Sequence, residues 1–153
     1  METTRQVSVF LENKPGRLAN ILRALAREKL NVIALTIAES HDHSALRLIV
    51  NDVPRTLEVL RGLGISFTEA DVLVVDLKNQ PGALAHVCEQ LASEHINIDY
   101  VYCSSGGKNG KVVGIFKVSN IEKALRLMRS SINNNRRPEA RLPRRQVTPK
   151  PVS

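Results

Sequence analysis

The chain has 153 residues, of which 42% are hydrophobic, and a formal net charge of +7. This length allows one large domain or two small ones. No apolar run approaches the roughly 18 residues of a membrane helix, the N-terminus lacks a signal-peptide pattern, and the two cysteines have no spacing motif. We therefore expect a protein of the reducing cytoplasm with no membrane partner.

The positive charge is concentrated at the C-terminal end. Residues 133–153 contain six Lys or Arg and one Glu, so residues 1–132 carry a net charge of only +2. The same segment contains four prolines and few apolar residues. Such a composition cannot bury enough apolar surface to offset the entropy of ordering, so we expect a basic, disordered tail over residues 133–153.

One four-residue motif occurs twice, 66 residues apart: Asn-Lys-Pro-Gly at residues 13–16 and Asn-Gln-Pro-Gly at residues 79–82. Apolar residues alternate before each copy as in a strand, and after each copy they recur with the spacing of one helix face. Proline suits the first helical turn, where its missing N–H costs no hydrogen bond. The match continues well beyond the motif, which predicts an internal duplication with domains at residues 5–70 and 71–132.

The duplicated elements follow in the same order. In the first repeat we expect strands over residues 6–11, 32–38, 46–50 and 65–69 and helices over residues 15–29 and 53–61. In the second we expect strands over residues 72–78, 97–104 and 112–118 and helices over residues 82–94 and 121–131. The glycine-rich residues 105–111 are predicted to be a hairpin turn, because Asn-Gly favours hairpins and no Ser or Thr follows the Gly-Lys pair as in a phosphate loop.

Strand, helix, strand, strand, helix, strand is the order of a ferredoxin-like βαββαβ unit, an α+β fold with both helices on one face of an antiparallel sheet. The second repeat has no apolar segment after residue 131, so its sheet should lack a fourth strand or take one from elsewhere. Residues 32–38 are apolar on both faces and need cover on both sides. Since such small units are marginal alone, we expect the two repeats to pack together.

Few side chains suit catalysis or metal binding. Two histidines flank Asp42 in a polar turn, but three ligands in three turn residues rarely close a coordination sphere. Cys88 matches Leu22 and is expected to pack in the core, and Cys103 matches Ile37 and is expected to be buried in the sheet. No histidine stands in an evident relation to a nucleophile and a carboxylate, so we expect no enzyme, no metal and no cofactor.

Four asparagines recur at matching positions. Asn13 and Asn31 lie 18 residues apart, and so do Asn79 and Asn97. These residues can simply cap and end the first helix of each repeat. Alternatively they contact a ligand. A helix over residues 15–29 is about 21 Å long, so the two asparagines of one repeat cannot hold one small molecule. Pairing of the repeats about a pseudo-two-fold would bring Asn13 to Asn97 and Asn79 to Asn31.

An Asn-x-Pro-Gly-x-Leu-Ala turn, a helix and then Asn-Val or Asn-Ile at the next strand resembles the signature of the ACT domain, a small ferredoxin-like module that binds amino acids and regulates enzymes. The resemblance covers residues 6–128 and includes the repeat spacing of small stand-alone tandem ACT proteins. It implies a ligand in the crevice between two ACT units, held by the strand-to-helix loop of one and the start of the second strand of the other. Carried over by position, the ligand-binding residues are Asn13, Lys14, Pro15, Gly16, Leu18, Asn31, Val32, Asn79, Gln80, Pro81, Gly82, Leu84, Asn97 and Ile98.

The chemistry of these positions fits an amino acid. The N–H groups of Gly16 and Gly82 at helix N-termini suit a carboxylate, and an asparagine side chain can both accept from an ammonium group and donate to a carboxylate. Lys14 in one crevice matches Gln80 in the other, so the two crevices are unlike. We therefore expect an allosteric, amino-acid-binding regulatory protein without catalytic residues.

Two other functions stay open. The chain could be the regulatory subunit of an amino-acid biosynthetic enzyme, and either that enzyme or a second copy of the chain would be its partner. RNA-recognition motifs share the element order, but they stack bases on aromatic residues of the central strands. The third strands of the two repeats contain one aromatic residue, Phe116. Tyr100 and Tyr102 lie on the second strand of the second repeat. Contact with nucleic acid is therefore expected only through the basic tail, without sequence preference.

Overall fold

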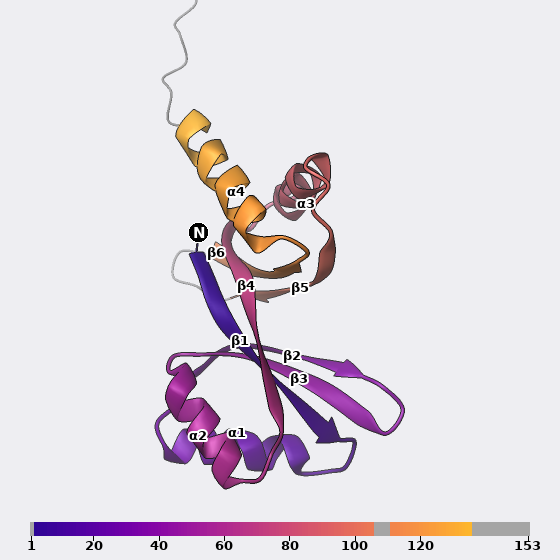
Figure 1. Ribbon diagram of the computed structural model, residues 1–153, viewed down its shortest axis with the longest axis vertical. Helices are drawn as coiled ribbons and strands as arrows, with labels where there is room; N and C mark the ends of the chain where they lie inside the picture. The colour runs from indigo at the N-terminus through magenta and orange to yellow at the C-terminus, as the bar shows by residue number, and fades with distance from the viewer. Residues whose placement is uncertain (1, 106–110, 136–153) are drawn as a thin grey trace, which may run out of the picture.

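A computed structural model describes residues 2–105 and 111–135 (Figure 1). Its elements are β1 (Glu2–Glu12), α1 (Arg17–Arg27), β2 (Val32–Glu39), β3 (His43–Val50), α2 (Val53–Gly62), β4 (Phe67–Lys78), α3 (Ala83–Ser93), β5 (Ile98–Ser105), β6 (Lys111–Val118) and α4 (Ile121–Asn135). The order confirms two ferredoxin-like repeats. Among the helices of the described part, none is both long and apolar enough to span a membrane.

All six strands form one antiparallel sheet in the order β2-β3-β1-β4-β6-β5. The long strands β1 and β4 run side by side through both halves of the molecule, with α1 and α2 in one half and α3 and α4 in the other (Figure 1). The two repeats therefore share their central strands. The sheet also curls, because its outermost strands β2 and β5 contact each other.

The strands predicted over residues 65–69 and 72–78 are one continuous strand, β4. Its first residues pair with residues 7–9 of β1 and complete the first repeat. Its later residues, from Leu73 to Lys78, pair with β6 and begin the second repeat. The separate strands of the prediction are wrong, because Glu69, Ala70 and Asp71 stay extended through pairing with β1.

The fourth strand of the second repeat comes from the N-terminus. Residues 2–5 of β1 pair with residues 71–74 of β4, on the side opposite β6. The alternative that this repeat takes a strand from elsewhere is thus confirmed. Arg5 lies opposite Asp71, its own equivalent in the duplication, so the pseudo-two-fold axis passes between these two residues.

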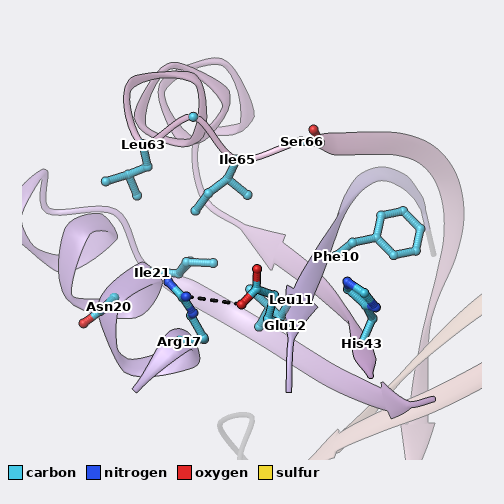
Figure 2. A pocket seen from close by; sticks show the side chains of 11 residues that line it. Phe10, Leu11, Glu12, Arg17, Asn20, Ile21, His43, Leu63, Ile65 and Ser66 are labelled. Atoms are coloured by element: carbon cyan, nitrogen blue, oxygen red, sulfur yellow. Dashed lines mark hydrogen bonds and ion pairs between the residues drawn. The ribbon is translucent and has the colours of Figure 1, made fainter. Parts of the chain in front are cut away.

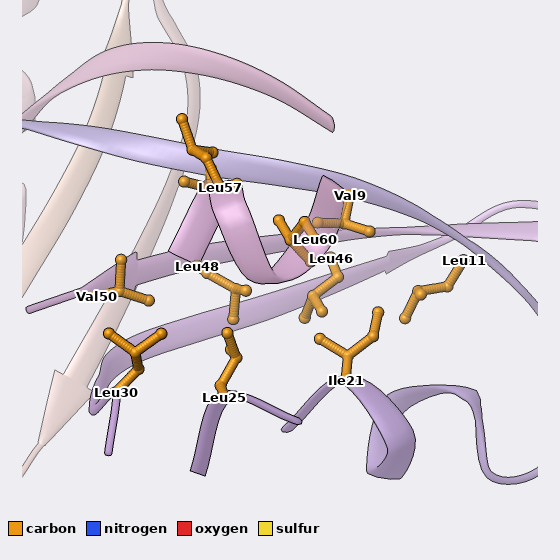
Figure 3. Close-up of a cluster of buried hydrophobic side chains, with 11 residues drawn as sticks. Val9, Leu11, Ile21, Leu25, Leu30, Leu46, Leu48, Val50, Leu57 and Leu60 are labelled. Carbon is orange, nitrogen blue, oxygen red and sulfur yellow. The ribbon is translucent and has the colours of Figure 1, made fainter. Parts of the chain in front are cut away.

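Each repeat has its own apolar core between its helices and its half of the sheet. In the first, Ile21 and Leu25 of α1 and Leu60 of α2 pack on alternate residues of β1 and β3 (Figure 3). In the second, Leu91 of α3 and Met128 of α4 pack on β4 and β6. These are the faces that the sequence periodicity predicted.

A third cluster joins the repeats on the face of the sheet that the helices do not cover. Ala34 and Ile49 of the first repeat lie with Val72 and Ile115 of the second. The expected packing of the two repeats is therefore confirmed, and the second repeat covers part of β2. The cover is partial, however, since only Ala34 of this strand is fully buried and three of its larger apolar residues are exposed. Burial on both faces was wrong for β2, because it is an edge strand.

Four other predictions need correction or concern residues outside the described ranges. Cys88 is half-buried against the second core as expected, but Cys103 is exposed because it lies on the edge strand β5. Helix α4 continues to Asn135, beyond its predicted end at residue 131 and beyond the predicted start of the tail at residue 133. The predicted hairpin turn and tail concern residues 106–110 and 136–153, which lie outside the described residues.

Candidate functional site

The two Asn-x-Pro-Gly motifs form the turns that lead from β1 into α1 and from β4 into α3. Gly16 and Gly82 are the N-cap residues, both with φ of 86°, and no side chain caps either helix. This left-handed backbone is what requires glycine. The space where a Cβ would project is open at both positions, so another molecule can approach the turn. Capping therefore does not explain Asn13 or Asn79.

The helix ends do not explain the second pair of asparagines either. Lys29 and His95 adopt the left-handed conformation after α1 and α3, both with φ of 55°. Asn31 lies two residues later, where its N–H donates to the side chain of Asn51 at 2.9 Å. Asn97 is held in the same way, its N–H donating to the Ser119 hydroxyl at 3.0 Å. The side chains of both asparagines thus sit at the starts of β2 and β5, outside the helices.

The sequence predicted two crossed asparagine pairs, Asn13 with Asn97 and Asn79 with Asn31. The structure does not bring the members of either pair together within one chain. The strand register places the start of β5, like the start of β2, near the level of the pseudo-two-fold axis at Arg5. Asn13 lies at the far end of β1, about 27 Å farther along the strand at the usual rise per residue. The juxtaposition of Asn13 with Asn97, and of Asn79 with Asn31, is therefore wrong for a single chain.

The other residues of the resemblance lie around these two turns and strand starts. Leu18, Val32 and Ile98 are half-buried against the repeat cores, whereas Leu84 is 39% exposed. The turn residues are exposed in both repeats: Asn13, Lys14, Pro15, Gly16, Asn79, Gln80, Pro81 and Gly82. No element of the same chain covers either turn within the described residues.

A hollow of about 540 Å³ opens beside the first turn, between α1, the end of β1 and the loop after α2 (Figure 2). Its rim carries an ion pair between Arg17 and Glu12 at 3.2 Å. Its lining residues are Phe10, Leu11, Glu12, Arg17, Asn20, Ile21, His43, Leu63, Gly64, Ile65 and Ser66. A hollow of about 590 Å³ lies at the equivalent place of the second repeat, beside Gln80 and Gly82.

The first turn carries a cluster of three charged side chains, whereas of the equivalent positions beside the second turn only Lys78, the equivalent of Glu12, is charged. Lys14 also pairs with Glu12, at 3.1 Å, and its hydrogen bond and charge, followed by the charge of Arg17, lower the pKa of Glu12. In the second repeat the residues equivalent to Lys14 and Arg17 are Gln80 and Ala83. The sequence indicated a difference between the two turns at Lys14 and Gln80. In the structure this difference extends to the whole charge cluster of the first turn.

The N–H of Asn13 donates to the carbonyl of Asp42 at 3.0 Å. This bond ties the first turn to the β2–β3 turn, so the turn that follows β2 lies beside Asn13, while β3 separates β2 itself from β1. The two histidines that flank Asp42 line a small hollow with Glu12 and Lys14. Among the residues that the structure describes, no group of three or more His, Cys, Asp or Glu side chains could hold a metal ion.

Both edges of the sheet are unpaired in the described chain, and β2 carries an apolar row. Ile33, Leu35 and Ile37 are 55%, 42% and 42% exposed, and Val101 on β5 is 37% exposed. Exposed backbone N–H and C=O groups beside such a row favour pairing with another strand. The apolar pattern of residues 32–38 is the sequence signal for this surface, although the pattern alone predicts burial on both faces of the strand.

Comparisons with known proteins agree with this architecture. Residues 2–135 match the model of a family described as the ACT domain pair. A similar solved structure is protein BT0572 from Bacteroides thetaiotaomicron, with 34% sequence identity, coverage of 85% of this chain and 89% of that one, and a TM-score of 0.79. No curated protein matches.

Regulatory chains of aspartate kinase share the fold at lower identity. The ligand-free regulatory subunit from Thermus thermophilus is 17% identical, with coverage of 86% of this chain and 97% of that one and a TM-score of 0.61. A chain of a structure of aspartokinase alpha and beta subunits is 22% identical, with coverage of 87% and 98% and a TM-score of 0.56. The match over residues 2–135 shows that this chain belongs to the ACT domain pair family.

Proposed function

We propose that the protein is an amino-acid-binding regulatory protein whose ligand sites form between two copies of the chain. The observation that carries this proposal is the placement of the four asparagines. Neither end of a helix explains them, they lie on exposed turns and strand starts, and one chain keeps the members of each crossed pair apart.

A second copy can supply the missing half of each site. If β2 of one chain lies antiparallel to β5 of the other, the start of β5 comes beside the end of β2. The end of β2 adjoins the turn that Asn13 contacts through Asp42. Asn97 of one copy then approaches Asn13 of the other. The pseudo-two-fold symmetry of the chain gives Asn79 and Asn31 the same relation.

Pairing β2 with β5 also resolves the two open edges. A symmetric dimer of this kind uses both edges of each copy and leaves none unpaired, whereas pairing β2 with β2 would leave β5 free. The closeness of β2 and β5 within the chain places both edges near each other. The apolar row around Leu35 and the exposed Val101 would become covered together.

The ligand chemistry follows from the turns. The first N–H groups of α1 and α3 have no partner within the helix and suit a carboxylate. The open space at Gly16 and Gly82 leaves room for it. An asparagine side chain from the other copy can bind the ammonium group, the carboxylate or both. The family and the shared fold with aspartate kinase regulatory subunits support an enzyme as the regulated partner.

A thermal-shift screen of the twenty amino acids, with the oligomeric state followed by analytical ultracentrifugation, tests the proposal. A ligand at one hundred times its Kd stabilises the fold by about 2.7 kcal/mol. Leu35→Lys should give monomers that no longer respond, while Ala26→Lys, which adds the same charge at an exposed position of α1 away from both edges and both hollows, should leave dimer and response intact. A monomeric parent chain, or no response to any amino acid, would refute the proposal.

The pairing within the dimer is tested by charge. Asn31→Asp and Asn79→Asp should each weaken binding by repelling the ligand carboxylate. A double-mutant cycle should show coupling between these two positions and additivity, within about 0.5 kcal/mol, between Asn31 and Asn13. Asn120→Asp is the matched control, because Asp can also cap α4, where Asn120 accepts from the N–H of Lys123. Coupling of Asn31 to Asn13 instead would show that like repeats pair.

A further inference from the structure

The starts of β2 and β5 differ in one contact that bears directly on ligand binding. The side-chain amide of Asn97 donates to the carboxylate of Asp99 at 3.0 Å. At the equivalent place in the first repeat, two residues after Asn31, stands Ile33. Among the described residues, none hydrogen-bonds the side chain of Asn31 in this way.

We propose that Asp99 closes the crevice containing Asn97 to amino acids, so that each chain binds one ligand, at the crevice containing Asn31. This inference rests on the proposed function and assigns the two crevices different roles. Asp99 offers Asn97 the kind of group that a bound amino acid would offer, namely a carboxylate. One amide donor of Asn97 is therefore already used within the chain itself.

The second hydrogen of the Asn97 amide does not rescue the site. A ligand carboxylate that accepted it would lie within about 4–6 Å of Asp99, where like charges disfavour each other strongly. Lys117 lies 3.6 Å from Asp99 and offsets part of this charge, but it also holds the carboxylate in place on the strand. Its equivalent in the first repeat is the apolar Ile49, so the start of β2 has neither charge.

The contact of Asn97 with Asp99 lies within one chain and is the same however two copies pair. The turn that faces the start of β2 can be that of Asn79 or that of Asn13. In both cases the asparagine at the start of β2 is Asn31, whose side-chain amide has no such internal partner among the described residues. The strand start with an internal carboxylate is always Asn97. The prediction is therefore a stoichiometry, measurable once any amino acid has been found to bind.

Isothermal titration calorimetry of the full chain with the amino acid found in the screen tests this. The parent should bind one molecule per chain, and Asn31→Asp should weaken that binding at least about tenfold. Asp99→Ile, which copies the first repeat, and Asp99→Asn should each raise the stoichiometry to two. Glu89→Gln removes an exposed carboxylate from the middle of α3, away from both strand starts, and should leave the stoichiometry at one.

The outcomes separate the two proposals. Absence of binding to the parent refutes the proposed function. Two equivalent sites in the parent, or a stoichiometry of one in both Asp99 variants, refutes only the role of Asp99. A second measurement needs no ligand and compares the NMR spectra of the parent and Asp99→Asn. The signal of the Asn97 side-chain amide should shift between them, and that of Asn31 should not. An unchanged Asn97 signal would also overturn the inference.

Discussion

Replacing Gln6 with valine should destabilise the protein, and the loss should largely disappear when Tyr100 and Tyr102 are also replaced by phenylalanine. Gln6 is fully buried between the repeats. Its amide donates to the Tyr100 hydroxyl at 2.5 Å and accepts from the Tyr102 hydroxyl at 2.8 Å. The equivalent residue of the duplication is Val72, which lies in the apolar cluster between the repeats. Valine therefore fits this kind of position when its surroundings are apolar.

The magnitude follows from the groups left without partners. A buried polar group without a hydrogen bond costs about 1–3 kcal/mol. Two hydroxyl groups lose their partner in Gln6→Val, but both tyrosines are half-buried, so water can replace part of the loss. We expect a total of about 2 kcal/mol, near the lower end for two groups. Removing both sides of the interaction leaves no unpaired group, so the triple variant should lie within about 1 kcal/mol of the parent.

Urea unfolding followed by circular dichroism measures these values, with a single transition expected because both repeats share β1 and β4. The loss in Gln6→Val corresponds to a lower Tm by about 4–8 °C. The ring of Tyr100, which stacks under the Arg47 guanidinium at 4.0 Å, is kept in the phenylalanine variant. A single variant as stable as the parent, or a triple variant no better than the single one, would refute the role of Gln6.

The remaining predictions use the same assays. Gly16→Ala should cost about 1–2 kcal/mol because of its left-handed backbone, and Lys29→Gly should be stabilising by about 1 kcal/mol for the same reason. Burial, with a smaller contribution from Tyr100, raises the pKa of Tyr102. The unfolded chain then ionises first, so stability should fall as pH rises above about 10, and less steeply in Tyr102→Phe. Truncation after Asn135 should leave the Tm and ligand response unchanged, since the removed sequence lacks apolar periodicity; a fall of more than a few degrees would show that it packs.

The sequence by itself determined the local structure of this protein. The duplication, the alternation of β1 and the helix face of Ile21 and Leu25 predicted the elements and both repeat cores, because such patterns depend only on the geometry of one strand or helix. The strand-to-helix turns followed from Pro15 and Gly16, although Pro15 precedes the N-cap Gly16 and does not lie in the first helical turn as predicted. The left-handed backbone that requires glycine at Gly16 is seen only in the structure.

Only the tertiary structure decided which strands are neighbours. Alternation tells which face of a strand is buried but not which strand lies beside it, so the continuity of β4 and the use of residues 2–5 as the fourth strand of the second repeat could not be predicted. The same limit applies to the exposed Cys103 and Ile37, whose strands lie at the edges of the sheet. The separation of Asn13 from Asn97 also depends on register, since the shared strands β1 and β4 extend in opposite directions from the pseudo-two-fold axis and carry the two turns to opposite ends of the molecule.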